Sequence, residues 1–224
     1  ALLGALDALT GRRRGAREIA RLAHRVETER LGLQSGVQDQ IAAARGRITF
    51  IRMRKYPDSE PRAVRLSDRT WNEIDRRLAL VYLGRPHRST DMHERVIAAL
   101  EAGGPQKKTL AELSRIAREA HLALLAGDLG SLGACMVRNN EKQRTLSPGL
   151  VSASADAVSA VARRFRAAGW KVNGAGGRGG SMSVLASGDD GLRRRMIAAV
   201  EALGRGIRVI PISLSPRGLS VWDA

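Results

Sequence analysis

Apolar residues recur at helical spacing over much of the chain, and short β-branched or continuous apolar runs lie between these segments. The helical pattern covers residues 1–9, 15–30, 41–45, 91–102, 109–126, 129–140, 158–165 and 192–203. The strand-like runs cover residues 48–53, 78–83, 170–172, 182–186 and 207–212. This order of elements predicts an α+β fold with an antiparallel sheet.

Several residues mark where these elements begin or end. Thr109 with Glu112 has the spacing of a capping box at a helix start. Gly127 is expected to end that helix and Asp128 to cap the next one. Pro211 lacks an amide hydrogen, so the last strand should lie at a sheet edge or carry a bulge. The polar segment 56–61, which contains two prolines, is expected to be a loop.

The chain is expected to consist of two modules that meet near residues 67–76. The boundaries that we assign are 1–70 for the first module and 71–224 for the second. A strand at residue 78 opens the second module, a helix-rich stretch follows, and three strands close it.

A formal charge of +16 raises the question of nucleic-acid binding, because Lys and Arg neutralise phosphates. Only 3% of the residues are aromatic, which is few for a protein on which bases would stack. The arginines are spread over many predicted helices, as is typical of solvated surface. Nucleic acid is therefore an unlikely partner, and the positive field could instead steer anionic substrates.

The single cysteine, Cys135, excludes an internal disulfide and favours a reducing, cytoplasmic location. No apolar run reaches the length of a membrane span, so no membrane association is expected. Residues 1–9 have the apolar spacing of a buried helix, and the chain begins inside this pattern at Ala1 without a capping residue, which suggests a cut in a longer sequence.

Two distant segments resemble the GHMP kinases, the family of galactokinase and mevalonate kinase. The first runs from Glu27 to Gln40 and ends in Leu-Gly-Leu-Gln-Ser-Gly-Val-Gln-Asp-Gln, which is most similar to the bacterial heptose-phosphate kinase and fucokinase branch. The second, residues 171–181, resembles the glycine-rich third signature of the family. Residues 139–148 are also similar to a stretch of that branch. The co-occurrence of these motifs in order makes the resemblance specific.

The resemblance implies an ATP-dependent kinase that phosphorylates a sugar or sugar phosphate with Mg²⁺. By its position in the motif, Asp39 would accept or orient the proton of the attacking hydroxyl. Glu29 would be the magnesium-associated carboxylate, with Glu27 as its competitor. Ser35 and Gly36 would form the turn that approaches substrate.

In the third signature, Gly174, Gly176 and Gly177 would form the loop that supports the nucleotide. The first module would be the remainder of a ribosomal-S5-type domain, and the second would be ferredoxin-like. This interpretation requires Asp39 and the 174–180 turn to share a cleft. Arg178, where the family usually has glycine, could reach a phosphate or partly block the loop.

The phosphate-loop motif of the family is missing from this sequence, so it could lie on a separate N-terminal segment or chain. The alternative is a catalytically incompetent remnant or pseudokinase that acts as a binding module. Simpler roles also exist for each residue: Asp39 could cap a helix that begins near Gln40, and Glu29 could pair with Arg25. The four histidines are expected to be ordinary surface or partly packed residues.

Overall fold

The computed structural model describes residues 1–85, 97–98, 106–174 and 179–222. The chain divides into two compact units, residues 1–65 with 214–224 and residues 66–213. The predicted boundary at 70/71 lies close to this division. Residues 214–222 differ from the prediction, because they belong to the first unit. Leu219 contacts the small core of this unit, and its amide donates to the carbonyl of Ala44.

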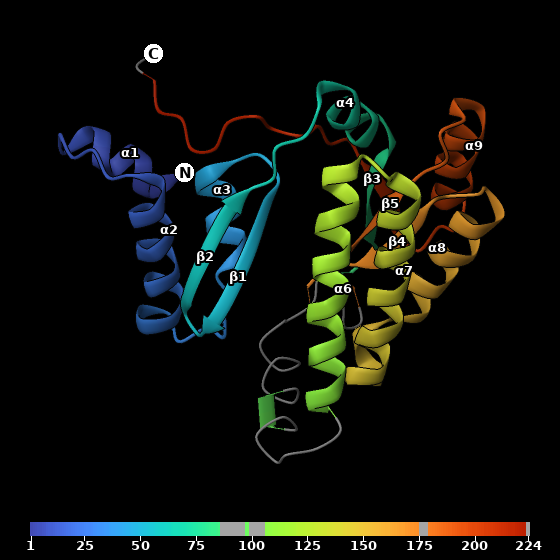
Figure 1. The fold of residues 1–224 in the computed structure, drawn as a ribbon, viewed down its shortest axis with the longest axis horizontal. Helices are drawn as coiled ribbons and strands as arrows, with labels where there is room; N and C mark the ends of the chain where they lie inside the picture. Colours follow the sequence, from blue (N-terminus) through green and yellow to red (C-terminus); the bar gives the residue numbers. More distant parts are fainter. Residues whose placement is uncertain (86–96, 99–105, 175–178, 223–224) are drawn as a thin grey trace. The chain divides into compact units, whose positions relative to one another are not determined.

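The first unit combines short helices with one hairpin (Figure 1). Its elements are α1 (Leu2–Leu9), α2 (Ala16–Arg25), a π-helical turn (Val26–Arg30), α3 (Gln38–Arg45), β1 (Thr49–Lys55) and β2 (Asp58–Ala63). Buried side chains of α2 and α3, with Val37 before α3, form its core, in which Ile19, Ala20, Ile41 and Ala44 take part. This core is small, so hydrogen bonds between polar side chains are expected to contribute to the stability of the unit.

Two expectations for this unit are corrected. Residues 58–63 form β2, which pairs antiparallel with β1 and places Ile51 opposite Pro61. We predicted a loop because this strand is polar and contains a proline, which is tolerated where its nitrogen need not donate. The apolar face expected to be buried in α1 is largely exposed at Leu2 (73%) and Leu9 (83%).

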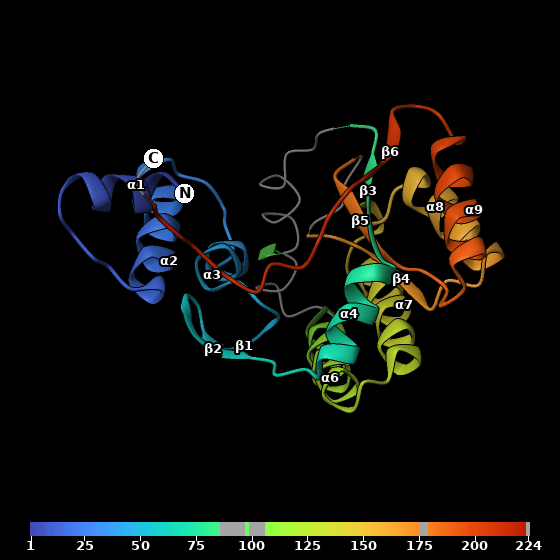
Figure 2. The ribbon, with the colours of Figure 1, turned by 90° about the horizontal axis from the view of Figure 1, so that it is seen from above.

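The second unit packs helices on one face of a four-stranded antiparallel sheet in the order β4-β5-β3-β6 (Figure 2). Its strands are β3 (Leu78–Leu83), β4 (Gly169–Val172), β5 (Ser181–Leu185) and β6 (Ile207–Ile210). Its helices are α4 (Asp68–Arg77), α6 (Gln106–Ala126), α7 (Leu129–Leu146), α8 (Ala153–Arg164) and α9 (Asp190–Glu201), with a 3₁₀ turn at Pro148–Leu150. The predicted α+β class with antiparallel sheet is confirmed.

The core of this unit explains the alternation of its strands. Val81, Val172, Met182 and Val184 are fully buried, and they meet side chains of α8 and α9 such as Val158. The intervening strand residues point to the opposite face, where Leu80, Tyr82, Lys171 and Ser183 are half-buried. The two faces of the sheet are thus chemically distinct, one aliphatic and the other mixed polar.

The expected helix ends are confirmed in part. Gly127 ends α6 with φ +70°, and the Asp128 carboxylate accepts a hydrogen bond from the amide of Ser131 at 2.9 Å. The β6 strand lies at the sheet edge, as Pro211 implied. The prediction of a capping box at Thr109 is wrong, because α6 already begins at Gln106 and Thr109 lies inside the helix. The helix expected over 91–102 falls almost wholly outside the described residues.

Candidate functional site

The segment that leads to Asp39 is held by a network of polar side chains. The Glu27 carboxylate accepts hydrogen bonds from the Ser35 hydroxyl at 2.5 Å and from the Gln40 side-chain nitrogen at 2.7 Å. That nitrogen also lies 3.1 Å from Ser35 Oγ. Three residues that are separated in sequence, on the π-helical turn, the loop and α3, therefore form one connected cluster.

A second set of contacts fixes the main chain of the same loop. The carbonyl oxygen of Ser35 accepts from Tyr56 Oη at 3.0 Å and lies 3.2 Å from His24 Nε2. The two rings meet edge to face, with His24 Nε2 2.8 Å from Tyr56 Oη. His24 is buried, so it is a structural support of the loop and not the ordinary residue that the sequence suggested.

Asp39 is the second residue of α3, and its side chain is exposed. The helix begins at Gln38, with Val37 in the cap position and no side-chain cap. The alternative role of Asp39 as the cap of a helix near Gln40 is therefore wrong. No described residue forms a hydrogen bond or ion pair with its carboxylate. Its place in the first turn is favourable for a negative charge, because the amide hydrogens there point toward the helix start.

The two glutamates of this segment have different surroundings. Glu29 is exposed and accepts three hydrogen bonds from the Arg25 guanidinium, each at 3.2 Å. This is the ion pair that we considered as the simpler role of Glu29. Glu27 is half-buried and contacts the loop that carries Ser35. The metal role of Glu29 stays a prediction. Glu27 is the glutamate linked to the Asp39 region, because it accepts a hydrogen bond from Gln40, the next residue along α3.

Glycine has a different importance at two positions of the loop before α3. Gly32 has a φ of +64°, which favours glycine, whereas a Cβ added to Gly36 would first meet the flexible end of the Gln38 side chain, at 2.2 Å. The hydroxyl of Ser35 donates within the chain to Glu27. In this conformation Ser35 stabilises the turn, and its predicted contact with substrate stays a prediction.

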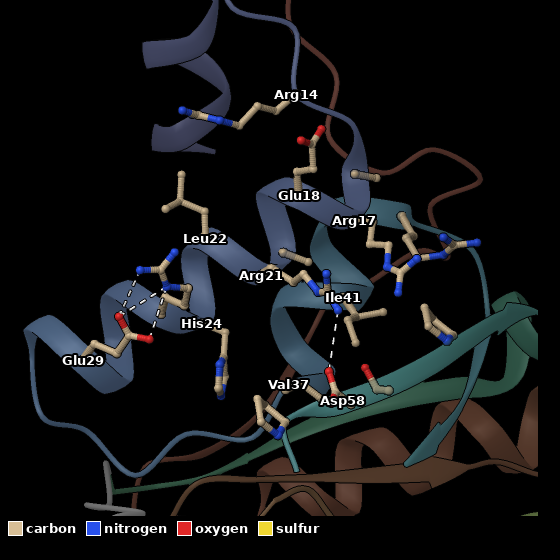
Figure 3. A pocket seen from close by; sticks show the side chains of 17 residues that line it. Arg14, Arg17, Glu18, Arg21, Leu22, His24, Glu29, Val37, Ile41 and Asp58 are labelled. Carbon is tan, nitrogen blue, oxygen red and sulfur yellow. Dashed lines mark hydrogen bonds and ion pairs between the residues drawn. The ribbon is translucent and has the colours of Figure 1, made fainter. Parts of the chain in front are cut away.

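A cavity of about 610 Å³ lies beside α2, α3 and the start of β2 (Figure 3). Five arginines and three acidic residues line it: Arg14, Arg17, Arg21, Arg25, Arg45, Glu18, Glu29 and Asp58. Figure 3 shows Arg21 reaching toward Asp58, at 3.6 Å, and Glu29 beside α2. Val37 and Ile41 line this cavity, but Asp39 between them does not.

The Glu27 carboxylate is a candidate ligand for Mg²⁺, and the Gln40 side chain directs its nitrogen toward it. The side-chain oxygen of Gln40 is buried and has no hydrogen-bond partner among the described residues. It belongs to the same cluster as the Glu27 carboxylate and the Ser35 hydroxyl. No group of three or more His, Cys, Asp or Glu residues in the described part of the chain could hold a metal. One carboxylate is nevertheless compatible with magnesium, which takes one or two carboxylates together with phosphate oxygens.

In the second unit, several glycines meet at one end of the sheet. Gly84 follows β3, Gly174 follows β4, Gly180 precedes β5 and Gly206 precedes β6; all four have positive φ. A Cβ on Gly84 would lie 2.2 Å from the carbonyl oxygen of Arg205. Of the predicted nucleotide-loop residues, Gly174 lies at this glycine-rich end, whereas Gly176, Gly177 and Arg178 lie outside the described residues.

Helix α7 fixes the start of this glycine-rich turn. Asn140 is buried, and its side-chain oxygen accepts from the amide of Val172 at 3.1 Å. Gln143 donates from its side chain to the carbonyl of Gly174 at 3.0 Å. Both residues belong to the 139–148 stretch that carried part of the resemblance, but neither was predicted to have a role. Their spacing of three residues on one helix face was the available signal.

Asp39 lies in the first unit and Gly174 in the second. Their predicted common cleft therefore stays a prediction. No helix in the described part of the chain is long and apolar enough to cross a membrane.

Solved structures of several small-molecule kinases share this architecture. A D-glycero-D-manno-heptose 1-phosphate kinase from Bacteriodes thetaiotaomicron superposes with a TM-score of 0.71 at 20% identity, over 99% of this chain and 60% of that one. Lactococcus lactis galactokinase gives 0.69 at 16% identity, over 97% and 64%. L. major mevalonate kinase gives 0.66 at 22% identity, over 83% and 54%. The chain has the GHMP-kinase fold.

No protein-family model matches the chain, and a search of curated proteins found no significant match. The chain spans about three-fifths of the length of the heptose 1-phosphate kinase and the galactokinase. At such low identity the structural likeness shows the GHMP-kinase fold alone. The predicted resemblance is thereby confirmed at the level of fold, and activity must be argued from the residues.

Proposed function

We propose that this protein takes part in the ATP-dependent phosphorylation of a hydroxyl group on a sugar or sugar phosphate. The GHMP-kinase fold supports this class of reaction, because the kinases that share it act on small molecules. Phosphoryl transfer depends mainly on positioning and on stabilising charge. A suitable protein therefore needs a carboxylate aimed at the nucleophile and groups that hold the phosphates.

The exposed carboxylate of Asp39 on a rigidly held helix start is the observation that carries the proposal. Gln40, its neighbour, is buried and tied to Glu27, which limits how far this first turn can move. The carboxylate itself engages no described partner, so it is available to accept the proton of a substrate hydroxyl or to orient it.

Glu27 is the better candidate than Glu29 for the carboxylate associated with Mg²⁺. It lies in the cluster with Ser35 and the buried oxygen of Gln40, whereas Glu29 is exposed and paired with Arg25. When bound, the metal would neutralise phosphate charge. Glu27 would then hold the metal. In the second unit, the glycine-rich turn that begins at Gly174 is the predicted support for ATP.

The test is ATP turnover with a panel of sugars and sugar phosphates, measured on the full-length protein. Asp39→Asn should lower turnover by at least ~10²-fold, the usual scale for a positioned acid or base. Asp68→Asn is a matched control, because Asp68 is also exposed in the first turn of a helix and belongs to the second unit. Its turnover should stay unchanged.

Retention of activity in Asp39→Asn would overturn the assignment of this carboxylate. A native protein that binds ATP or a sugar phosphate without any turnover would support the alternative, a pseudokinase that acts as a binding module. The length of the chain, three-fifths of the heptose 1-phosphate kinase that it resembles, is what keeps this alternative open. The predicted cytoplasmic location and separate N-terminal segment stay predictions.

A further inference from the structure

The face of the second unit's sheet that points away from its aliphatic core carries two ordered rows of side chains. The register places Lys171, Ser183, Leu80 and Ile210 side by side across the four strands. It places Asn173, Ser181, Tyr82 and Arg208 in the adjoining row. The second row lies next to the glycine-rich end. The helices α7, α8 and α9 contribute to the core on the other face.

The strands themselves bring positive charge and no acidic residue to this face. The four strands contain no Asp or Glu, and their charged residues are Lys171 and Arg208. Arg208 lies over the ring of Tyr82, 5.3 Å from its centroid. Lys171 is half-buried, and its ammonium donates to the carbonyl oxygen of Val172 at 2.6 Å. No ion pair joins it to a carboxylate within the described residues.

A half-buried ammonium group without a carboxylate is unfavourable, because burial removes water and no opposite charge replaces it. This burial lowers the pKa of Lys171 below its ordinary value. The other lysine for which a close contact is described, Lys142, pairs with Glu112 on α6. Unlike Lys142, Lys171 does not stabilise the fold through an ion pair with a described carboxylate. An anionic ligand would supply the negative charge that its ammonium group lacks.

A relay of hydrogen bonds beside Lys171 leaves one further donor. The hydroxyl of Ser183, directly opposite Lys171, donates to the side-chain oxygen of Asn173 at 2.9 Å. The nitrogen of Asn173 donates to the hydroxyl oxygen of Ser181 at 3.1 Å. Both ends of the Asn173 amide are therefore used, and the hydroxyl hydrogen of Ser181 has no acceptor among the described residues.

We propose that Lys171 and Ser181 bind a phosphate group on this face of the sheet, beside the glycine-rich end. An ammonium donor with an ordered hydroxyl donor is a suitable set for phosphate oxygens. The phosphate could belong to a nucleotide or to a sugar phosphate, and the binding chemistry is the same. This proposal deepens the proposed function, but its test requires neither turnover nor Asp39.

The experiment measures equilibrium binding by calorimetry to the wild-type chain with three probes. ADP represents the nucleotide, glucose 1-phosphate represents the sugar phosphate, and glucose is the uncharged control. Lys171→Met removes the charge at nearly constant volume, Lys171→Arg retains it, and Lys108→Met is the control for net charge, since Lys108 is exposed on α6. Thermal unfolding is recorded for each variant without ligand.

Lys171→Met should lower the affinity for one of the two phosphate-bearing probes by about tenfold to a hundredfold. This is the range for a lost hydrogen bond to a charged group. The affected probe identifies the source of the phosphate. Lys171→Arg should recover part of the affinity, and Lys108→Met should retain all of it. Without ligand, Lys171→Met should unfold at the same or a higher temperature, because it removes a desolvated charge.

Two results would overturn the proposal. One is unchanged affinity for ADP and for glucose 1-phosphate in Lys171→Met, and the other is an equal loss in Lys108→Met. A lower unfolding temperature of ligand-free Lys171→Met with unchanged affinity would show that Lys171 serves only to hold Val172. Because binding is measured without catalysis, a failed proposal for Lys171 leaves the role of Asp39 untouched, and a failed kinase assay leaves the binding result intact.

Discussion

The two units stabilise their candidate turns in different ways. In the first unit, side chains hold the loop before α3, and the Glu27 carboxylate connects Ser35 with Gln40. In the second, main-chain contacts hold the glycine-rich end: the amide of Leu83 donates to the carbonyl of Gly180, and the amide of Gly180 donates to the carbonyl of Arg85. The loop before α3 is therefore held by hydrogen bonds between side chains. The glycine-rich end is held by main-chain hydrogen bonds, which glycine permits because it has no side chain.

The size of the local core accounts for this difference. The first unit buries few apolar residues around Ile19 and Ile41, so its loop needs dedicated polar partners. The second unit surrounds Val81 and Met182 with three helices, and its strands can bring their turns close together. Substitutions should consequently affect the two turns through different mechanisms and by different amounts.

The largest effect on stability is expected where a side chain would meet the main chain. A Cβ on Gly179 would lie 2.0 Å from the carbonyl oxygen of Arg85, so Gly179→Ala forces the strands apart. We expect the free energy of unfolding of the second unit to fall by about 3 kcal/mol, the upper range for overpacking. Urea unfolding followed by hydrogen exchange of the β3 and β5 amides measures it.

Gly174→Ala is the matched control for that substitution. Its φ is +60°, but no described residue lies within 4 Å of an added Cβ, so only backbone strain of about 1 kcal/mol is expected. If both variants lose the same stability, close approach of the main chain does not explain the glycine-rich end.

An intermediate effect is expected at Glu27 in the first unit. Glu27→Ala removes the carboxylate that accepts from the Ser35 hydroxyl and the Gln40 amide. These groups keep only the longer contacts to the Gly36 carbonyl at 3.2 Å and to Ser35 Oγ at 3.1 Å, so the loss should cost about 2 kcal/mol. The loss should appear as faster hydrogen exchange in α3, for example at the amide of Ile41. Glu29→Ala is the control, and it should have little effect, because exposed ion pairs such as Arg25–Glu29 contribute little. Equal effects at both positions would contradict the comparison.

The smallest effect is expected from acid titration of a helix cap in the second unit. The hydroxyl and amide of Ser131 donate to the Asp128 carboxylate and lower its pKa below the ordinary value. A carboxylate with a depressed pKa stabilises the folded state above its unfolded pKa of about 4, and this stability is lost as the pH falls through the folded pKa.

Asp128→Asn keeps a capping oxygen but cannot titrate. Its unfolding midpoint in urea, compared between pH 6 and pH 3, should therefore depend less on pH than that of the wild type. The rate of hydrogen exchange at the α3 amides in the first unit should change with pH to the same extent in the variant and in the wild type. A variant with the same pH dependence as the wild type would show that the cap charge is not a source of acid sensitivity.

Much of the second unit follows from local sequence. The continuous apolar run 78–83 and the alternation in 182–186 predict strands, although one face of β3 is only half-buried and not covered as that run implied. Gly127 with Asp128 predicts the end of one helix and the start of the next. The β2 strand could not be predicted in this way. Its sequence Asp-Ser-Glu-Pro-Arg-Ala has neither alternation nor β-branched residues, and only pairing with β1 makes it a strand.

For the candidate site, the sequence by itself determined the GHMP-kinase resemblance and the residues in question, namely Asp39, its two neighbouring glutamates and the glycine-rich turn. Only the tertiary structure distinguished Glu27 from Glu29. The two residues are two positions apart on a π-helical turn, so their side chains leave in different directions, one toward Ser35 and the other toward Arg25. Likewise, the sequence does not distinguish Lys171 from an ordinary strand residue. Only the packing around it shows that its ammonium group is half-buried and has no carboxylate partner among the described residues. Direction and burial depend on segments far apart in the chain, which is why local sequence cannot supply them.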